Sequence, residues 1–267
     1  MFGRRPDATL ARDVPALRRF MPFISPRRPE SMFWFSYDVD AEESFAYLAE
    51  LNAARPEKRP ITFFHLVLHA LVRVLHERPR MNRFVAGGRL WQRDGIWLSF
   101  SAKVAFDDDA PVITVKQRFD PNASVVELAD QIYDKLSAGR SGKKTTSDHE
   151  VDWMLRLPVP LIRLAMGAAH LADRFGLLPR AMIDSDPLYA SVFVANLGSV
   201  GLEGGYHHLW EHGNIGAFLV IGRFERGADG RRRVTIKITF DERIEDGLYA
   251  ARSLGAVKEW LEHPEKS

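Results

Sequence analysis

The residue types with the clearest chemical potential lie together near the C-terminal end of the sequence. Asp241, Glu242, Glu245 and Asp246 place four carboxylates within six positions, with Arg243 among them. A carboxylate can act as a general base when its surroundings raise its pKa, and a group of carboxylates can hold a divalent cation. A solvated turn, or one paired with arginine, is the more common arrangement. We therefore expect no metal here and keep Glu242 as a candidate base.

The secondary structure on either side of this turn can be predicted from the spacing of apolar residues. In residues 234–240 apolar side chains occupy every second position, which is the period of a half-buried strand. After the turn, Leu254, Val257 and Leu261 follow helical spacing. The acidic turn therefore joins a core strand to the last helix.

Histidines offer a second possible chemistry. His208, Glu211 and His212 fit the His-x-x-Glu-His pattern of one metallopeptidase group, which needs both histidines on one face of a sustained helix. Glycines on both sides limit any helix here to about two turns, so we disfavour a peptidase. His207, His208 and His212 remain candidates for a displaced base or an interface contact. His65 and His69 are one helical turn apart on an apolar segment, where buried structural histidines are expected rather than zinc ligands.

The remaining pattern predicts alternating strands and helices in a single domain spanning residues 1–267. Strands are expected at 31–39, 97–106, 112–116, 191–195 and 217–224, and helices at 40–54, from Thr62 to Pro79, from Ser124 and at 161–175. Capping boxes are expected at Asp40 with Glu43 and at Ser124 with Glu127. Residues 1–14 are expected to form a loose tail, and 139–189 a helical insertion. The helix at 161–175 is apolar over most of its circumference, which predicts cover from the core or a partner subunit.

Composition narrows the classes of protein. The formal net charge is only +2, so the charge balance does not indicate a nucleic-acid partner. The hydrophobic content of 46% is typical of a chain that folds around a core. There is no cysteine, which excludes disulfides and thiolate nucleophiles and fits a cytoplasmic protein. Neither a secretory signal nor an apolar run long enough to span a membrane is visible.

Five short segments, in order, resemble one known family. They are 79–82 (Pro-Arg-Met-Asn), 111–114 (Pro-Val-Ile-Thr), 194–198 (Val-Ala-Asn-Leu-Gly), 217–222 (Ala-Phe-Leu-Val-Ile-Gly), and the turn with Asp241, Arg243, Asp246 and Gly247. Together they resemble the catalytic domain of the dihydrolipoyl acyltransferases of 2-oxo acid dehydrogenase complexes, and chloramphenicol acetyltransferase. The resemblance covers about residues 15 to 264. It implies an α/β two-layer sandwich with a mixed β-sheet, a homotrimer with sites between subunits, and acyl transfer from coenzyme A.

The resemblance also assigns positions. Glu242 stands where the family has its catalytic histidine, and Ala195 where it has a serine or threonine that stabilises the oxyanion. Asp246 matches an aspartate that organises the turn. Asn196, Gly198, His208 and His212 are candidate substrate-binding residues. Coenzyme A or an acyl-CoA is the implied ligand, without a metal and without a lipoyl group on this chain.

Two classes of function therefore stand side by side. One is an enzyme, a stand-alone family member that is degenerate for the usual histidine-dependent transfer and uses Glu242 or a displaced histidine as its base. The other, a pseudoenzyme, is a catalytically silent relative that acts as a trimeric binding or scaffold protein. Turnover assays with acyl-CoA donors separate the two.

Overall fold

A computed structural model describes residues 4–103, 112–140 and 153–264. Its centre is a six-stranded mixed sheet in the order β2-β9-β8-β7-β5-β6. The β5–β7 and β7–β8 pairs are parallel and the other neighbours are antiparallel. The strands are β2 (Met32–Asp40), β5 (Ile96–Lys103), β6 (Val112–Phe119), β7 (Val192–Asn196), β8 (Ala217–Arg226) and β9 (Arg232–Asp241). Each strand predicted from the sequence is present.

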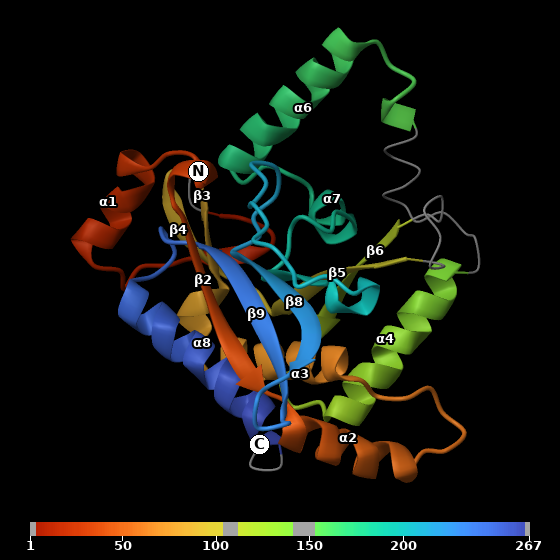
Figure 1. The fold of residues 1–267 in the computed structure, drawn as a ribbon. Coiled ribbons are helices and arrows are strands. Elements are labelled where there is room, and N and C mark those ends of the chain that lie inside the picture. Colours follow the sequence, from red (N-terminus) through yellow and green to blue (C-terminus); the bar gives the residue numbers. More distant parts are fainter. Residues whose placement is uncertain (1–3, 104–111, 141–152, 265–267) are drawn as a thin grey trace.

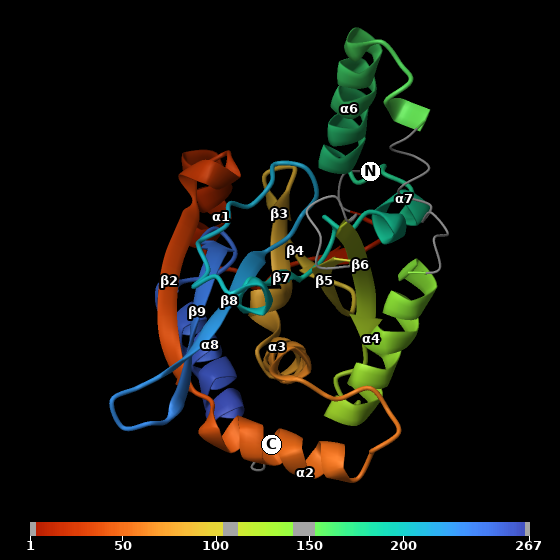
Figure 2. The ribbon, with the colours of Figure 1, turned by 45° about the vertical axis from the view of Figure 1, so that its right-hand side comes forward.

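Four helices pack on one face of this sheet (Figures 1 and 2) and form the larger hydrophobic core with it. They are α2 (Glu42–Ala53), α3 (Phe63–Glu77), α4 (Val125–Arg140) and α8 (Gly247–Glu262). Helix α3 lies deepest, because its apolar residues cover most of its circumference and ten of its fifteen residues are buried. This helix layer against the sheet is the two-layer α/β sandwich that the sequence predicts.

The other face of the sheet is covered mainly by irregular chain. Phe193, Phe218 and Val220 point to this side and pack with Leu209 and Trp210 from the loop after β7. A small sheet, β1-β4-β3, lies apart from the main one. The remaining elements are β1 (Ala8–Leu10), α1 (Ala16–Ile24), β3 (Arg83–Ala86), β4 (Arg89–Arg93), α6 (Val159–Arg174), α7 (Arg180–Ser185) and 3₁₀ turns at Arg28–Glu30, Pro79–Asn82 and Gly198–Val200.

The N-terminal segment is not the loose tail that we expected. Residues Ala8–Leu10 pair with β4, and the Arg5 guanidinium is buried against Asp7 at 2.9 Å and Asp173 at 2.7 Å. Asp7 also accepts a hydrogen bond from Asn214, whose side-chain oxygen and carbonyl both accept from Arg93. Buried charges are tolerated when they are paired and hydrogen-bonded. Long-range charge pairing therefore anchors a segment that has little hydrophobic pattern of its own.

Helix α6 also differs from expectation. It forms as predicted, but none of its residues is buried and it projects from the body of the molecule in both views (Figures 1 and 2). Leu164 is 68% exposed and Leu171 is 56% exposed. The chain's own core thus does not cover this helix. No helix within the described ranges combines the length and the apolarity needed to cross a bilayer.

One of the two expected capping boxes forms, at the start of α4. The Ser124 backbone N–H donates to the Glu127 carboxylate at 2.8 Å, and the Glu127 N–H donates back to the Ser124 hydroxyl at 3.2 Å. At α3 the capping box pairs Thr62 with His65. The capping box expected at Asp40 with Glu43 is wrong, because the Glu43 carboxylate contacts His263 instead.

Candidate functional site

The acidic turn follows directly from the end of β9. The Asp241 N–H donates to the Gly216 carbonyl at 3.0 Å, and the Glu242 N–H donates to the Ser31 carbonyl at 2.8 Å. The turn is therefore held by backbone bonds to the segments that enter β8 and β2. Its side chains divide sharply into buried and exposed ones.

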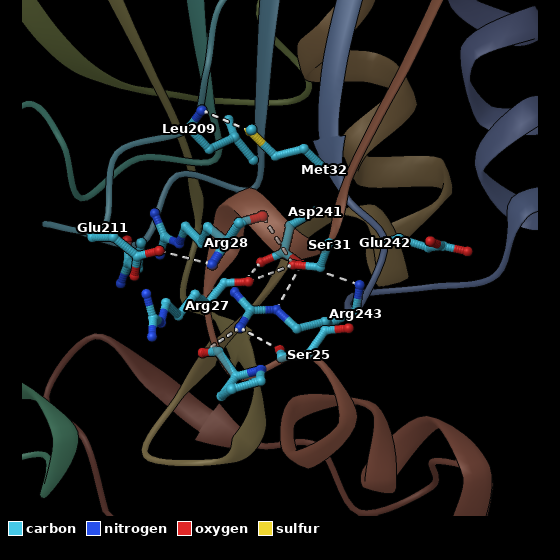
Figure 3. Close-up of polar contacts among 12 residues, drawn as sticks. Ser25, Arg27, Arg28, Ser31, Met32, Leu209, Glu211, Asp241, Glu242 and Arg243 are labelled. Atoms are coloured by element: carbon cyan, nitrogen blue, oxygen red, sulfur yellow. Dashed lines mark hydrogen bonds and ion pairs between the residues drawn. The ribbon is translucent and has the colours of Figure 1, made fainter.

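Asp241 and Arg243 form a buried ion pair at the centre of this region (Figure 3). Arg243 Nε and Nη2 donate to the two Asp241 oxygens at 2.8 and 2.7 Å, and the two side chains are only 4% and 3% exposed. The guanidinium also donates to the carbonyls of Ser25 and Pro26. Because both charges are fully engaged with each other, this pair holds the turn and is not available for proton transfer.

Glu242 is exposed, and its side chain points away from the buried pair (Figure 3). Its carbonyl oxygen accepts a hydrogen bond from Arg18 at 2.5 Å. Among the residues that the structure describes, its carboxylate makes no hydrogen bond or ion pair. Glu242 is thus the one acidic side chain of the turn that is free to meet a ligand or another protomer.

The other two carboxylates have structural partners. Glu245 is buried and contacts Arg80 at 3.2 Å and Arg83 at 3.6 Å. Asp246 caps α8 by accepting the Tyr249 N–H at 2.8 Å, and this hydrogen bond lowers the pKa of the carboxyl below its usual value. Arginines and a helix N-terminus therefore occupy the positions that a cation would need.

Ala195, Asn196 and Gly198 lie at the end of β7 and in the turn that follows. The Asn196 side chain accepts the Ser199 N–H at 3.1 Å, as a turn-forming asparagine does. Gly198 packs so closely on β8 that an added Cβ would lie 2.1 Å from the Gly222 oxygen. Asn196 and Gly198 thus have clear structural roles, while their assignment to substrate binding stays a prediction.

Within one chain, Ala195 and Glu242 do not form a single site. Ala195 is in register with Val220, and Val220 with Lys237, which precedes Glu242 by five positions. Two strand spacings and five residues of extended chain separate them by on the order of 15–20 Å. The two side chains therefore cannot contact the same reacting atom within one chain.

The histidines of residues 207–212 are not on a helix, since this stretch has irregular backbone. His208 is exposed and stacks on His207 with ring centroids 4.5 Å apart. His212 instead bonds to Asp186 through Nε2 at 2.6 Å and to His170 through Nδ1 at 3.1 Å. The geometry of a metallopeptidase is therefore absent from this stretch. Across the described part of the chain, no three His, Asp or Glu side chains are grouped to hold a metal.

His65 and His69 are structural histidines. His65 is buried at the start of α3, where its Nδ1 accepts the Thr62 N–H at 3.1 Å. Burial, with a smaller effect of Arg55, lowers its pKa to about 4. The His69 ring lies 3.2 Å from the Ala123 carbonyl, and burial lowers its pKa as well.

A cavity of about 450 Å³ lies beside the turn. Arg243 and Arg28 line one part of it and His170, Arg174 and Tyr189 another. Arg28 is almost fully buried and donates to the carbonyls of Trp210 and Gly213 at 2.6 and 2.8 Å. No sequence pattern predicted this cavity, because its walls come from segments distant along the chain.

Solved structures similar to this chain include acyltransferases. Azotobacter vinelandii dihydrolipoamide acetyltransferase is 18% identical with a TM-score of 0.61, over 97% of this chain and 94% of that chain. The cubic core of a pyruvate dehydrogenase multienzyme complex is 16% identical with a TM-score of 0.59, over 97% and 94%. For chloramphenicol acetyltransferase the identity is 14% and the TM-score 0.55, over 95% and 99%.

The chain has the chloramphenicol acetyltransferase-like fold. No protein-family model matches its sequence, and no curated protein matches it either. The similarity extends over nearly the whole of both chains. The fold class expected from the five sequence segments is thus confirmed. Residues 104–111, which include Pro111 of one segment, lie outside the described residues.

Proposed function

We propose that this chain is a stand-alone protein of the acyltransferase fold that binds coenzyme A-linked acyl groups, and that acyl transfer by a histidine on the β9–α8 turn is lost. The observation that carries the proposal is the combination of the fold with Glu242. The turn is kept, its buried Asp241–Arg243 pair is kept, and the exposed position between them holds a carboxylate.

The chemistry of the substitution explains the loss. An ordinary glutamate has a pKa near 4.3 and a thiol near 8.5, so proton transfer from thiol to carboxylate is uphill by about 5–6 kcal/mol. Desolvation strengthens a carboxylate as a base, but within the single chain Glu242 is exposed and has no such environment. At the second position, the methyl group of Ala195 donates no hydrogen bond, and losing one oxyanion donor costs about 10²–10³ in rate.

We further propose that the chain assembles as a homotrimer or a higher assembly, in the cytoplasm. The separation of Ala195 from Glu242 within one chain supports sites shared between protomers. Large exposed apolar residues on α1, including Leu17 at 71% and Phe23 at 66%, supply surface for such contacts. One structure of similar fold is the cubic core of a multienzyme complex. Light scattering coupled to size-exclusion chromatography tests the assembly, and a monomer at micromolar concentration would contradict it.

Binding and turnover test the function separately. Calorimetry with acetyl-coenzyme A measures binding to the wild type and to Glu242→Gln, which keeps the shape of the side chain without its charge. We expect saturable binding by both. The absence of binding by the wild type would reject the proposal.

Restoring the missing groups tests whether the site persists. The variant Glu242→His with Ala195→Ser is expected to gain acetyl transfer by about 10²-fold or more over wild type, because a positioned general base alone contributes about 10²–10⁴. Glu242→Gln with Ala195→Ser is the matched control, which restores the hydroxyl without the base. Equal rates for the two double variants would contradict the assignment of Glu242 to the catalytic position.

A scaffold function is the second candidate. The exposed apolar side chains of α6 favour it, because Leu164 is 68% and Leu171 56% exposed. Saturable acetyl-coenzyme A binding without any turnover supports a binding protein over an enzyme.

A further inference from the structure

Three side chains from distant parts of the sequence form a continuous hydrogen-bonded chain. The Asp186 carboxylate lies 2.6 Å from His212 Nε2, and His212 Nδ1 lies 3.1 Å from His170 Nε2. Asp186 follows α7, His212 belongs to the loop before β8, and His170 is on α6. The Tyr189 ring packs edge-on against His212 at 5.7 Å and restricts its orientation.

The order of atoms in this chain limits which tautomers of the two rings are compatible with its hydrogen bonds. The second Asp186 oxygen accepts the Leu188 N–H at 2.8 Å, so both oxygens serve as acceptors. A carboxylate has no proton to give, and His212 Nε2 must therefore be the donor. When His212 is neutral, its other nitrogen is an acceptor, and His212 Nδ1 then accepts from His170 Nε2–H. What is left is a lone pair on His170 Nδ1.

His170 lines the cavity of about 450 Å³ whose other walls include Arg243, the residue after Glu242. A second cavity of about 410 Å³ shares the wall at Gly87 and Arg174 and is lined by Trp91, Leu171 and Phe175. The two together fit a small molecule with an apolar body and one reactive polar end.

We infer that His170 is the general base of an acyl transfer to a small thiol bound in these cavities, with His212 and Asp186 as positioning residues. The inference rests on the proposed binding of an acyl-CoA. His170 Nδ1 takes the thiol proton, the sulfur forms a bond to the thioester carbonyl carbon, and the bond from that carbon to the coenzyme A sulfur breaks. The proton on His170 then passes to the leaving thiolate, so atoms and charge balance.

The same chain stabilises the charge that the step creates. Once His170 is protonated, its Nε2–H bond to His212 becomes charge-assisted, and Asp186 lies at the far end of the chain with the opposite charge. The His170–His212 bond alone attaches α6 to the loop before β8. The Asp186–His212 bond adds no further link between α6 and this loop, and its effect is to select the tautomer of His212.

The kinetic test uses full-length protein with acetyl-coenzyme A as donor and dihydrolipoamide as thiol acceptor, with the acetylated acceptor measured by chromatography. His170→Ala is expected to lower kcat by about 10²–10⁴-fold, and added imidazole to raise the rate of this variant but not of wild type. Asp186→Asn is expected to lower kcat by about 10²-fold or more with little change in KM, because an amide can donate to His212 and reverse the tautomer. His263→Gln is the matched control, since it removes a histidine–carboxylate contact of 2.8 Å elsewhere, and it should leave the rate unchanged.

The second test reads the tautomers without turnover. Long-range ¹⁵N–¹H spectra of histidine-labelled wild type should show the proton of His212 on Nε2 and an unprotonated Nδ1 on His170. Protonated Nδ1 on either ring would overturn the inference. Wild-type binding of acetyl-coenzyme A without any transfer to the thiol would also overturn it, as would turnover that His170→Ala leaves intact. These results leave the proposed function standing, whereas failure to bind acetyl-coenzyme A rejects the proposed function itself.

Discussion

Protonation of His65 should destabilise the protein as the pH falls below neutrality. The ring is buried, and its Nδ1 accepts the N–H of Thr62 at the start of α3, which requires the neutral form. Burial lowers its pKa from 6.5 to about 4. The unfolded chain therefore binds a proton on this ring below about pH 6.5, while the folded chain does not until about pH 4.

The size and direction of the effect follow from these two values. Stability from His65 is complete above the unfolded pKa and is lost as the pH falls through the window from 6.5 to about 4. Between pH 7.5 and pH 5 the expected loss is about 2 kcal/mol, and the full shift of about 2.5 units corresponds to about 3.4 kcal/mol.

The assay is urea denaturation of wild type and His65→Gln at both pH values. Glutamine at this position can complete a capping box with Thr62 and does not titrate. The lost ring packing lowers the stability of the variant equally at both pH values. His69 shifts in the same direction and is present in both proteins, so the difference between their pH dependences isolates His65. Identical pH dependences for the two proteins would refute the reasoning.

Two further predictions concern the turn and the segment after β7. Asp241→Asn should lower the unfolding free energy by about 3–5 kcal/mol, because it leaves the buried Arg243 charge without its partner, whereas Glu242→Gln should change it by no more than about 0.5 kcal/mol. Equal effects in denaturant titrations would contradict the division into buried and exposed carboxylates. Gly198→Ala should destabilise the fold strongly, since its Cβ would lie 2.1 Å from a β8 carbonyl oxygen, while Gly255→Ala in α8 has open space and should add up to about 1 kcal/mol. Thermal melts that move in the same direction for both glycine variants would disprove the packing argument.

The regular elements were predictable because their causes are local. Alternating apolar residues gave β9 and helical spacing gave α8, since a side chain's face follows directly from its position along a strand or helix. The cap of α4 was predictable for the same reason, because Ser124 and Glu127 satisfy each other's backbone groups. The capping box expected at Asp40 is absent because the Glu43 carboxylate contacts a distant residue, His263.

The sequence by itself determined the strands, the helices and the acidic turn that holds Glu242. It did not determine which carboxylates of that turn are buried, because Asp241, Glu242 and Glu245 differ only in the partners that tertiary contacts bring to them. Nor did it bring together His170, Asp186 and His212, which no periodicity connects. The prediction of a loose N-terminal tail is wrong for the same reason, since the buried Arg5 guanidinium pairs with Asp173, 168 positions away. Hydropathy reports how each segment orders its own side chains, whereas charge pairing and proton transfer depend on distances that exist only after the segments have packed.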